Sequence, residues 1–209
     1  MRSGLLPGPF RSDNLYRVPD AHFAEPRLAE LYGPLHPDRG DLVPHAAIAD
    51  EFGALAVLDI GCGTGTFACL LAEGGKDVTG VDPAAASLEV ARRKPYADRV
   101  RWVLGDCSAP PALQFDMATM TGNVAQVFLK LGTVETWATL VEVNILFVSF
   151  GTTFVFASDG AVFTSDSTLR FRERAEVIES LYTAGFVVRG VRDAPDRPSL
   201  EFVFIASAN

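Results

Sequence analysis

The sequence predicts an α/β fold, in which a mostly parallel sheet carries helices on both faces and an antiparallel region follows at the C-terminal end. Short apolar runs alternate with segments of helical periodicity up to about residue 130, which is typical of parallel strands joined by helices. The first three runs also end at glycines or acids. After about residue 140 the strand-like segments follow one another through turns, which favours antiparallel pairing.

The composition fits one domain over residues 1–209. The chain has 48% hydrophobic and 21% charged residues, which is ordinary globular composition. Its net charge of −8 repels phosphate backbones, so we expect no nucleic-acid partner. Three cysteines without a CxxC pair and three histidines without ligand spacing argue against a disulfide framework and a metal site. We find no apolar run typical of a signal peptide or membrane span, and expect a cytoplasmic protein with no membrane partner.

Two regions precede the parallel part. Residues 1–20 are rich in proline and glycine and lack periodicity, so we expect a loose N-terminal arm. Residues 21–53 are expected to form a helical lid. Its two helices should cover residues 22–32, with Pro34 and Pro37 stopping the first, and residues 43–52, with Gly53 ending the second.

Residues 54–130 should form the parallel core. Its expected strands are 56–60, 77–81, 100–104 and 115–120, and its expected helices are 67–73, 84–93 and 123–129.

Residues 132–209 should form the antiparallel and C-terminal part. Its expected elements are strands 141–150, 152–157 and 161–171, with a turn at 158–160, a helix at 173–184 capped by Gly185, and strands 186–191 and 201–206 around a turn at 193–198.

The strongest chemical signal is the sequence VLDIGCGTG over residues 57–65, where a strand turns sharply into a helix. Glycines at 61, 63 and 65 allow the backbone to lie against a ligand, because a Cβ atom would block that approach. They also leave peptide N–H groups and a helix N-terminus facing the ligand. Asp59, near the end of the strand, can accept hydrogen bonds from loop amides or from a ligand ammonium group.

Two further acids follow the next two strands. Asp82 closes the second strand, where a carboxylate can accept both hydroxyls of a ribose. Asp106 follows the third, where an acceptor can meet the amino group of adenine. Each acid alone is equally well explained as a surface residue or a helix cap. Together they lie at the edge where ligands bind in open α/β sheets, which favours a nucleoside site.

These residues resemble the class I methyltransferases, whose motif is an acid before GxGxG and a second acid ending the next strand. The match covers about residues 50–130 and implies a Rossmann-like fold, S-adenosylmethionine as cofactor and methyl transfer as the activity. Residues 115–126 resemble the fourth motif of the family. Residues 164–172 and 193–198 resemble the C-terminal region of a group of small actinobacterial-type methyltransferases.

The resemblance implies a set of donor contacts in residues 54–130. These are Asp59, Gly61, Cys62, Gly63, Thr64, Gly65, Asp82, Pro83, Asp106, Cys107, Thr121 and Asn123. The acceptor is expected to be a small molecule, with Tyr32, His36 and Gln126 as candidates for its pocket. His36 is the candidate base if the lid covers the site, and a loop histidine with a local hydrogen bond is the alternative. The acceptor and the oligomeric state stay open.

Two rival interpretations also stay open. A nicotinamide-dependent or flavin-dependent oxidoreductase would carry GxGxxG, but Thr66 stands where its last glycine would be. A module that binds the donor without catalysis is the second rival.

One element of the resembling family has no counterpart in the sequence. No apolar strand candidate lies between Leu129 and Trp137, where the family has a fifth parallel strand. A parallel crossover needs about a dozen residues, so this connection is too short. Either a core strand has been lost or residues are missing from the sequence between Leu129 and Gly132. We expect the second, because losing an interior strand exposes an apolar sheet edge. A continuous chain with residues 141–150 in the fifth position would contradict this topology.

Overall fold

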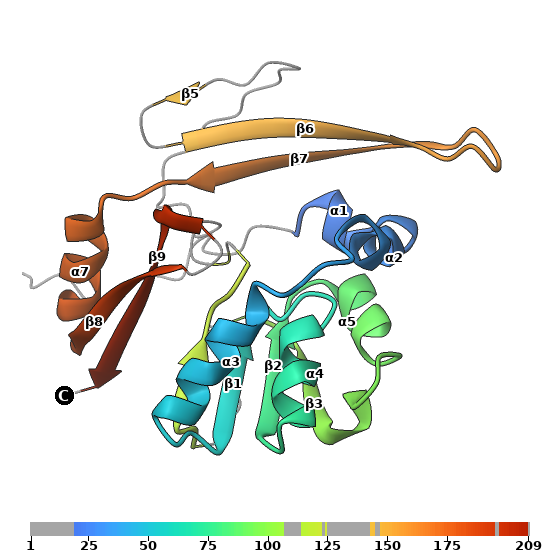
Figure 1. The fold of residues 1–209 in the computed structure, drawn as a ribbon. Coiled ribbons are helices and arrows are strands. Elements are labelled where there is room, and N and C mark those ends of the chain that lie inside the picture. The colour runs from blue at the N-terminus through green and yellow to red at the C-terminus, as the bar shows by residue number, and fades with distance from the viewer. Residues whose placement is uncertain are drawn as a thin grey trace, which may run out of the picture.

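A computed structural model describes residues 19–106, 114–122, 124, 143–144, 147–194 and 197–208. In it, a parallel sheet with packed helices lies beneath a long antiparallel hairpin, and a second hairpin stands beside the sheet (Figure 1). The helices are α1 (Ala21–Ala24), α2 (Pro26–Leu35), α3 (Leu42–Glu51), α4 (Thr66–Glu73), α5 (Ala85–Ala91), the 3₁₀ helix η1 (Ala97–Arg99) and α7 (Arg174–Thr183). The strands are β1 (Ala56–Ile60), β2 (Asp77–Asp82), β3 (Val100–Leu104), β4 (Met117–Thr119), β5 (Val143–Asn144), β6 (Phe147–Val155), β7 (Val162–Arg170), β8 (Phe186–Ala194) and β9 (Arg197–Ala208).

The parallel sheet has the strand order β3-β2-β1-β4. Val57 of β1 lies beside Val78 of β2 and Met117 of β4, so β1 is a central strand. Every pairing in this sheet is parallel, and the carboxyl ends of its strands therefore meet at one edge. The prediction of a Rossmann-like α/β fold is confirmed.

The main core lies between the sheet and the helices α3 and α4, which stand in front of the sheet in Figure 1. Phe67 and Leu71 are four residues apart on α4, so they share the face that packs on the sheet. They meet Val57 and Val78, both fully buried. Successive strand residues face opposite sides, so Leu58, also buried, faces away from this core. Both faces of the sheet are therefore covered, as expected for parallel strands.

The lid differs from the prediction in two details. The expected helix 22–32 is divided at Glu25, whose extended backbone separates α1 from α2. Pro34 does not stop α2, which continues to Leu35. A proline in the last turn removes a single helical hydrogen bond, and the helix tolerates that loss there. Ser87 of α5, fully buried, donates its hydroxyl hydrogen to the Phe23 carbonyl at 2.9 Å and fixes the lid to the parallel core.

The antiparallel part also differs from its expected bounds. We expected strands 141–150 and 152–157, but β6 runs without interruption from Phe147 to Val155. Gly151 does not break it, because this residue pairs with Asp166 in the β6–β7 ladder. The strands β8 and β9 are also longer than predicted, and their pairing continues to Ala194 and Arg197.

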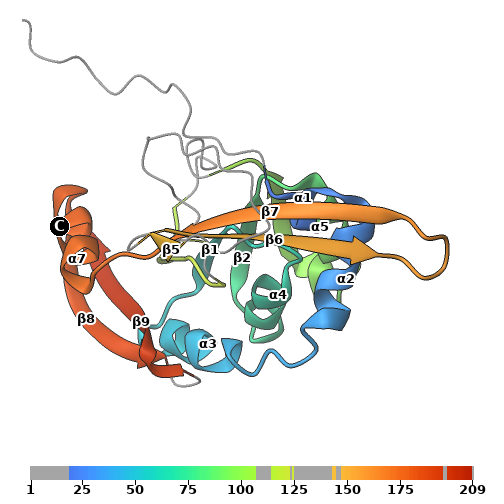
Figure 2. The same ribbon diagram turned by 90° about the horizontal axis from the view of Figure 1, so that it is seen from above.

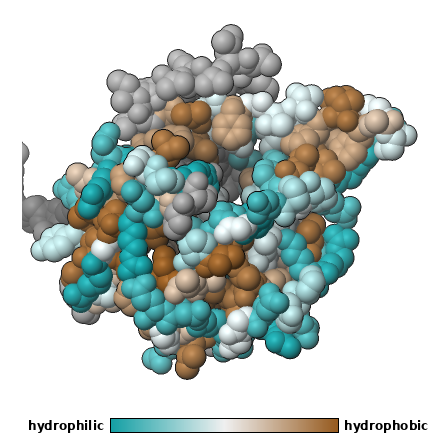
Figure 3. Space-filling model, in the orientation of Figure 1, coloured by the Kyte–Doolittle hydropathy of each residue, from teal (hydrophilic) through white to brown (hydrophobic). Residues whose placement is uncertain are grey.

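The hairpin β6–β7 passes above the carboxyl ends of the parallel strands and over α1 and α2 (Figures 1 and 2). Arg27 of α2 joins both oxygens of Asp159 near its tip, at 2.9 and 3.2 Å. The backbone N–H of His22 donates to Oγ of Ser165 at 3.0 Å. Exposed apolar side chains lie on the other face of the same hairpin, where Val155 pairs with Val162, and Figure 3 shows apolar colour along this arm. These contacts join α1 and α2 to the hairpin β6–β7, and we call the three elements together the roof.

The expected fifth parallel strand is not found among the described residues, where the sheet ends at β4. The connection between Leu129 and Gly132 lies outside these residues, as does most of the expected helix 123–129. Residues 143–144 and 147–150 belong to the separate antiparallel sheet and do not occupy the fifth position. In the described ranges, no helix is both long and apolar enough to cross a membrane.

Candidate functional site

The loop after β1 turns back on itself at the carboxyl edge of the sheet. Gly61, Gly63 and Gly65 all have positive φ angles, of 69°, 54° and 77°. The N–H groups of Gly61 and Cys62 both donate to the carbonyl of Val81, at 2.8 and 3.1 Å, which fastens the loop to the end of β2. The loop therefore has a fixed shape and leads directly into α4.

A side chain would be excluded at two of the three glycines by the protein itself, and not by a ligand. A Cβ atom at Gly61 would lie 2.5 Å from Cγ2 of Val124. A Cβ atom at Gly65 would lie 2.5 Å from Cη2 of Trp102 and 2.7 Å from Cβ of Ala91. At Gly63 it would meet nothing within 4 Å. Only Gly63 faces open space, so a ligand can approach the backbone at this position.

Asp82 is held at the end of β2 by two backbone amides. Its Oδ2 accepts from the N–H of Gly63 at 2.7 Å, and its Oδ1 accepts from the N–H of Ala84 at 2.8 Å. Burial raises the pKa of this carboxyl group, and the two backbone hydrogen bonds act against that rise. Each carboxylate oxygen has a second lone pair, so Asp82 can still accept two more hydrogen bonds.

Asp59 lies one strand away and is almost completely buried. Its Oδ1 accepts a hydrogen bond from Oγ1 of Thr119 on β4 at 3.1 Å. Its Oδ2 is buried and has no hydrogen-bond partner among the described residues. Burial raises the pKa of Asp59 to about 7, the Thr119 bond lowers it, and the charge of Asp82 raises it further. A buried oxygen without a partner is costly, which points to a donor group that a ligand supplies.

The other expected contacts lie near these acids, with two outside the described residues. Asp106 is half-buried after β3, and the N–H of Gly105 before it donates to the backbone carbonyl of Asp82 at 3.0 Å. The strand ends that carry Asp82 and Asp106 are therefore adjacent. Cys62 and Thr64 are buried, Pro83 is exposed, and Thr121 is half-buried after β4; Cys107 and Asn123 lie outside the described residues.

Sequence reasoning missed Lys94, which follows α5. Its Nζ donates to Oγ1 of Thr66 at 2.5 Å and to Oγ1 of Thr64 at 3.3 Å. Burial lowers the pKa of this ammonium group. Lys94 thus ties the segment after α5 to the first turn of α4. No spacing in the sequence marks this contact, because it depends on how the two helices pack.

The expected acceptor residues lie on and after α2. His36 is exposed, and its Nδ1 hydrogen-bonds the carbonyl of Tyr32 at 2.9 Å. The two rings lie 4.7 Å apart. His36 therefore has the local hydrogen bond of the alternative interpretation, and its role as a base stays a prediction. Gln126 lies outside the described residues. Within the described part, no cluster of three or more His, Cys, Asp or Glu residues could hold a metal ion.

Residues 57–142, which include the glycine loop, Asp82 and Asp106, match a family model described as a methyltransferase domain. No curated protein matches the sequence.

Three solved structures have the same fold. A protein of Streptomyces venezuelae, DesVI, has 17% identity and a TM-score of 0.62, covering 87% of this chain and 98% of its own. An S-adenosylmethionine-dependent methyltransferase from Clostridium acetobutylicum has 14% identity and a TM-score of 0.61, covering 88% and 98%. An amino pentose methyltransferase of calicheamicin biosynthesis from Micromonospora echinaspora, solved with S-adenosylmethionine, has 20% identity and a TM-score of 0.58, covering 86% and 97%.

Proposed function

Since this chain is a class I S-adenosylmethionine-dependent methyltransferase, we propose that it holds the donor at the carboxyl edge of β1, β2 and β3 and methylates a small-molecule acceptor. One observation carries the proposal. Asp59 and Gly63, which belong to the same strand and loop, meet Asp82 of the neighbouring strand at this edge, where the N–H of Gly63 donates to Asp82 at 2.7 Å.

The chain's own residues fit the chemistry of the donor. S-adenosylmethionine carries an ammonium group, two ribose hydroxyls and an adenine amino group. The unpartnered Oδ2 of Asp59 suits the ammonium group, because a cation beside a buried carboxylate stabilises its charged form. The two free lone pairs of Asp82 suit the ribose hydroxyls. Asp106 suits the adenine amino group, with Pro83 and Cys107 beside the nucleoside.

The glycine loop would supply shape rather than charge. The open space at Gly63 lets the backbone approach the donor, while Gly61 and Gly65, which lie against protein side chains, and the buried Cys62 and Thr64 hold that backbone in place. Thr121, after β4, and Asn123 would complete the pocket. When bound, the donor supplies an activated sulfonium methyl group.

The protein's main task in the reaction would be to align the acceptor atom with this methyl group. Alignment alone can supply up to about 7–11 kcal/mol of the barrier in an ideal two-reactant case. A base is then optional, and His36 is the candidate if one is used.

The acceptor would bind beneath the roof that α1 and α2 form with the hairpin β6–β7, above the donor core of residues 54–130. Two observations support this: the hairpin β6–β7 passes above the carboxyl ends of the strands, and it is tied to the lid through Arg27 and Asp159 (Figure 2). One similar structure is an amino pentose methyltransferase, so a sugar-sized acceptor fits the proposal. The described cysteines, Cys62 and Cys69, are buried free thiols, which suits the reducing cytoplasm.

The proposal is tested by incubating the dialysed protein with methyl-labelled S-adenosylmethionine and a panel of amino sugars, sugars and small phenols. Label should pass to at least one small molecule and not to added RNA or DNA. The comparison variant is Asp82→Ala, in which weaker donor binding should reduce the transfer at a donor concentration that does not saturate the variant. Transfer to nucleic acid alone would contradict the proposed acceptor class.

A further inference from the structure

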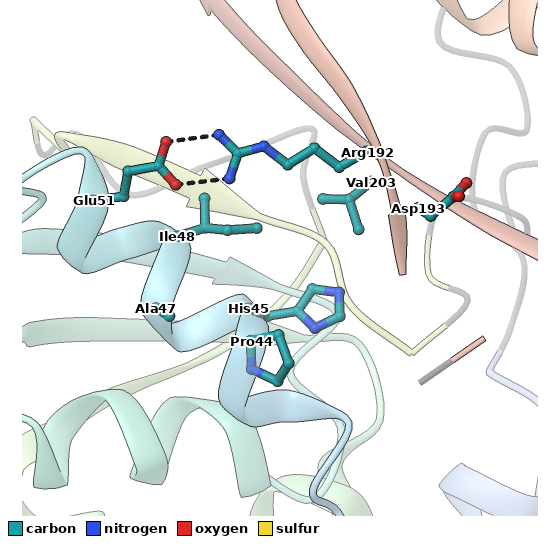
Figure 4. A pocket seen from close by; sticks show the side chains of 8 residues that line it. All are labelled: Pro44, His45, Ala47, Ile48, Glu51, Arg192, Asp193 and Val203. Atoms are coloured by element: carbon teal, nitrogen blue, oxygen red, sulfur yellow. Dashed lines mark hydrogen bonds and ion pairs between the residues drawn. The ribbon is translucent and has the colours of Figure 1, made fainter. Parts of the chain in front are cut away.

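A pocket lies away from the glycine loop, between α3 and the hairpin β8–β9 (Figure 4). Its volume is about 210 Å³, and no residue of 61–65 lines it. Ile48 and Glu51 come from one face of α3, with His45 one turn before them. Arg192 and Val203 stand opposite, side by side in the β8–β9 register.

The charges of the pocket wall compensate each other. Arg192 forms a two-point ion pair with Glu51, with N···O distances of 2.7 and 2.6 Å. Figure 4 shows this pair beside Ile48 and the carboxylate of Asp193 turned to the other side of β8. A charged ligand would gain little from a wall whose cation and anion are already paired. The apolar side chains of Ile48 and Val203 instead suit an uncharged body.

The imidazole of His45 offers a polar atom to a ligand. Nδ1 of His45 lies 2.9 Å from the carbonyl oxygen of Asp41. A carbonyl only accepts, so Nδ1 carries the hydrogen and Nε2 of the neutral ring is an acceptor. No hydrogen bond to Nε2 is found among the described residues, and Figure 4 shows the ring turned toward Val203. The ring is held by an edge contact with Phe67 of α4, with centroids 6.4 Å apart.

We propose that this pocket binds a small uncharged phenol, separate from the donor and beyond the function proposed above. The aromatic ring would lie between Ile48 and Val203, and the hydroxyl group would donate to Nε2 of His45. The size agrees, because an apolar cavity of about 150 Å³ takes up benzene, and this pocket has room for a ring with its hydroxyl group. A phenol with a pKa near 10, like that of tyrosine, keeps its proton at neutral pH.

The test is a titration of the isotope-labelled full chain, followed by the methyl resonances of Ile48 and Val203. The probes are phenol, its methyl ether anisole, which lacks the donor hydrogen, and the anion benzoate. Phenol should shift these resonances with an affinity about five- to tenfold above that of anisole, which is the worth of one hydrogen bond. Benzoate should bind no more tightly than anisole. Equal affinities for phenol and anisole, tighter binding of benzoate, or shifts confined to other residues would overturn the proposal.

Two variants locate the site. Val203→Trp fills the pocket and should abolish phenol binding, whereas Val43→Trp, on an exposed position of α3, should leave it unchanged. His45→Phe keeps an aromatic ring against Phe67 and should remove the preference for phenol over anisole. Wild-type phenol affinity in Val203→Trp, or a wild-type preference for phenol over anisole in His45→Phe, contradicts the assignment. Binding of S-adenosylhomocysteine, measured by calorimetry on each variant, reports the fold and the donor site independently. If a variant no longer binds S-adenosylhomocysteine, the comparison of phenol, anisole and benzoate on the wild-type chain decides whether the proposal holds.

Discussion

Thr119 donates its hydroxyl hydrogen to Oδ1 of Asp59 across 3.1 Å, and this bond joins β4 to β1 at the carboxyl edge of the sheet. The other oxygen of Asp59 is buried, and no hydrogen-bond partner for it lies in the part of the chain that the structure describes. The bond orients the carboxyl group but satisfies only half of it. The proposed donor ammonium would satisfy the other half, so Asp59 links the stability of the free protein to donor binding.

In the absence of donor, Asp59 should make stability depend on pH. Its pKa of about 7 in the folded state lies above the ordinary value of 3.8, so the folded state holds this proton more tightly than the unfolded state. The resulting stabilisation is complete below about pH 4 and is lost as pH rises through about 7, for a total of about 4 kcal/mol. Asp59→Asn keeps a partner for Thr119 but cannot titrate. Urea unfolding of both proteins should show that the free energy of unfolding of the wild type falls relative to that of Asp59→Asn as pH rises from 4 to 8. If the two free energies change in parallel with pH, Asp59 does not have the raised pKa.

Donor binding should release a proton from Asp59 near neutral pH. A bound ammonium group favours the carboxylate, so donor affinity should rise with pH up to about 7 and level off above it. Calorimetry in two buffers of different ionisation enthalpy measures this proton directly. The Asp59→Asn variant should bind more weakly and release no proton. Wild-type binding without proton release at pH 6.5 would refute the assignment of the ammonium group to Asp59.

Removing the carboxylate of Asp82 should weaken donor binding by about 1.5–3 kcal/mol, the worth of hydrogen bonds to a charged group. Calorimetric titration of Asp82→Ala with S-adenosylhomocysteine measures the loss. The matched control is Asp77→Ala, an exposed acid at the other end of β2, which should bind normally. Unchanged affinity in Asp82→Ala would rule out the ribose assignment.

The glycine loop should separate stability from binding. In Gly65→Ala, the new Cβ collides with Trp102 at a left-handed position, so we expect destabilisation of about 2–5 kcal/mol. Gly63→Ala meets no neighbour, so its cost should be about 1–2 kcal/mol, from the backbone alone, but it should weaken donor binding. Thermal unfolding and calorimetry together distinguish the two. Normal donor affinity in Gly63→Ala would place the donor elsewhere.

The parallel core could be predicted from the sequence because its signals are local. The strand of residues 56–60, the glycine loop and Asp82 are neighbours in the chain, and their order fixes the edge at which they meet. The bounds of β1 and β3 were correct. Longer-range features were missed. Gly151 looked like a strand end, but its pairing with Asp166 carries β6 through it.

The site residues that escaped prediction depend on contacts between distant segments. Thr119 reaches Asp59 only because β4 lies next to β1. The order of the strands in the sheet differs from their order in the sequence, so this contact could not be predicted from the sequence. Glycine is needed at position 65 because Trp102 packs against it, and at position 61 because Val124 does. The spacing of the glycines does not reveal these contacts. The pattern predicted where glycine is needed but not which glycine faces the ligand.

The most direct test of the donor site is a crystal structure of the protein with S-adenosylhomocysteine. The account predicts the ribose hydroxyls on Asp82, the adenine amino group at Asp106, and the ammonium group within hydrogen-bond distance, about 2.7–3.2 Å, of Oδ2 of Asp59. The peptide of Gly63 should lie against the ligand. A nucleoside bound away from the carboxyl edge of β1, β2 and β3, or Asp106 turned into solvent with the ligand in place, would contradict it.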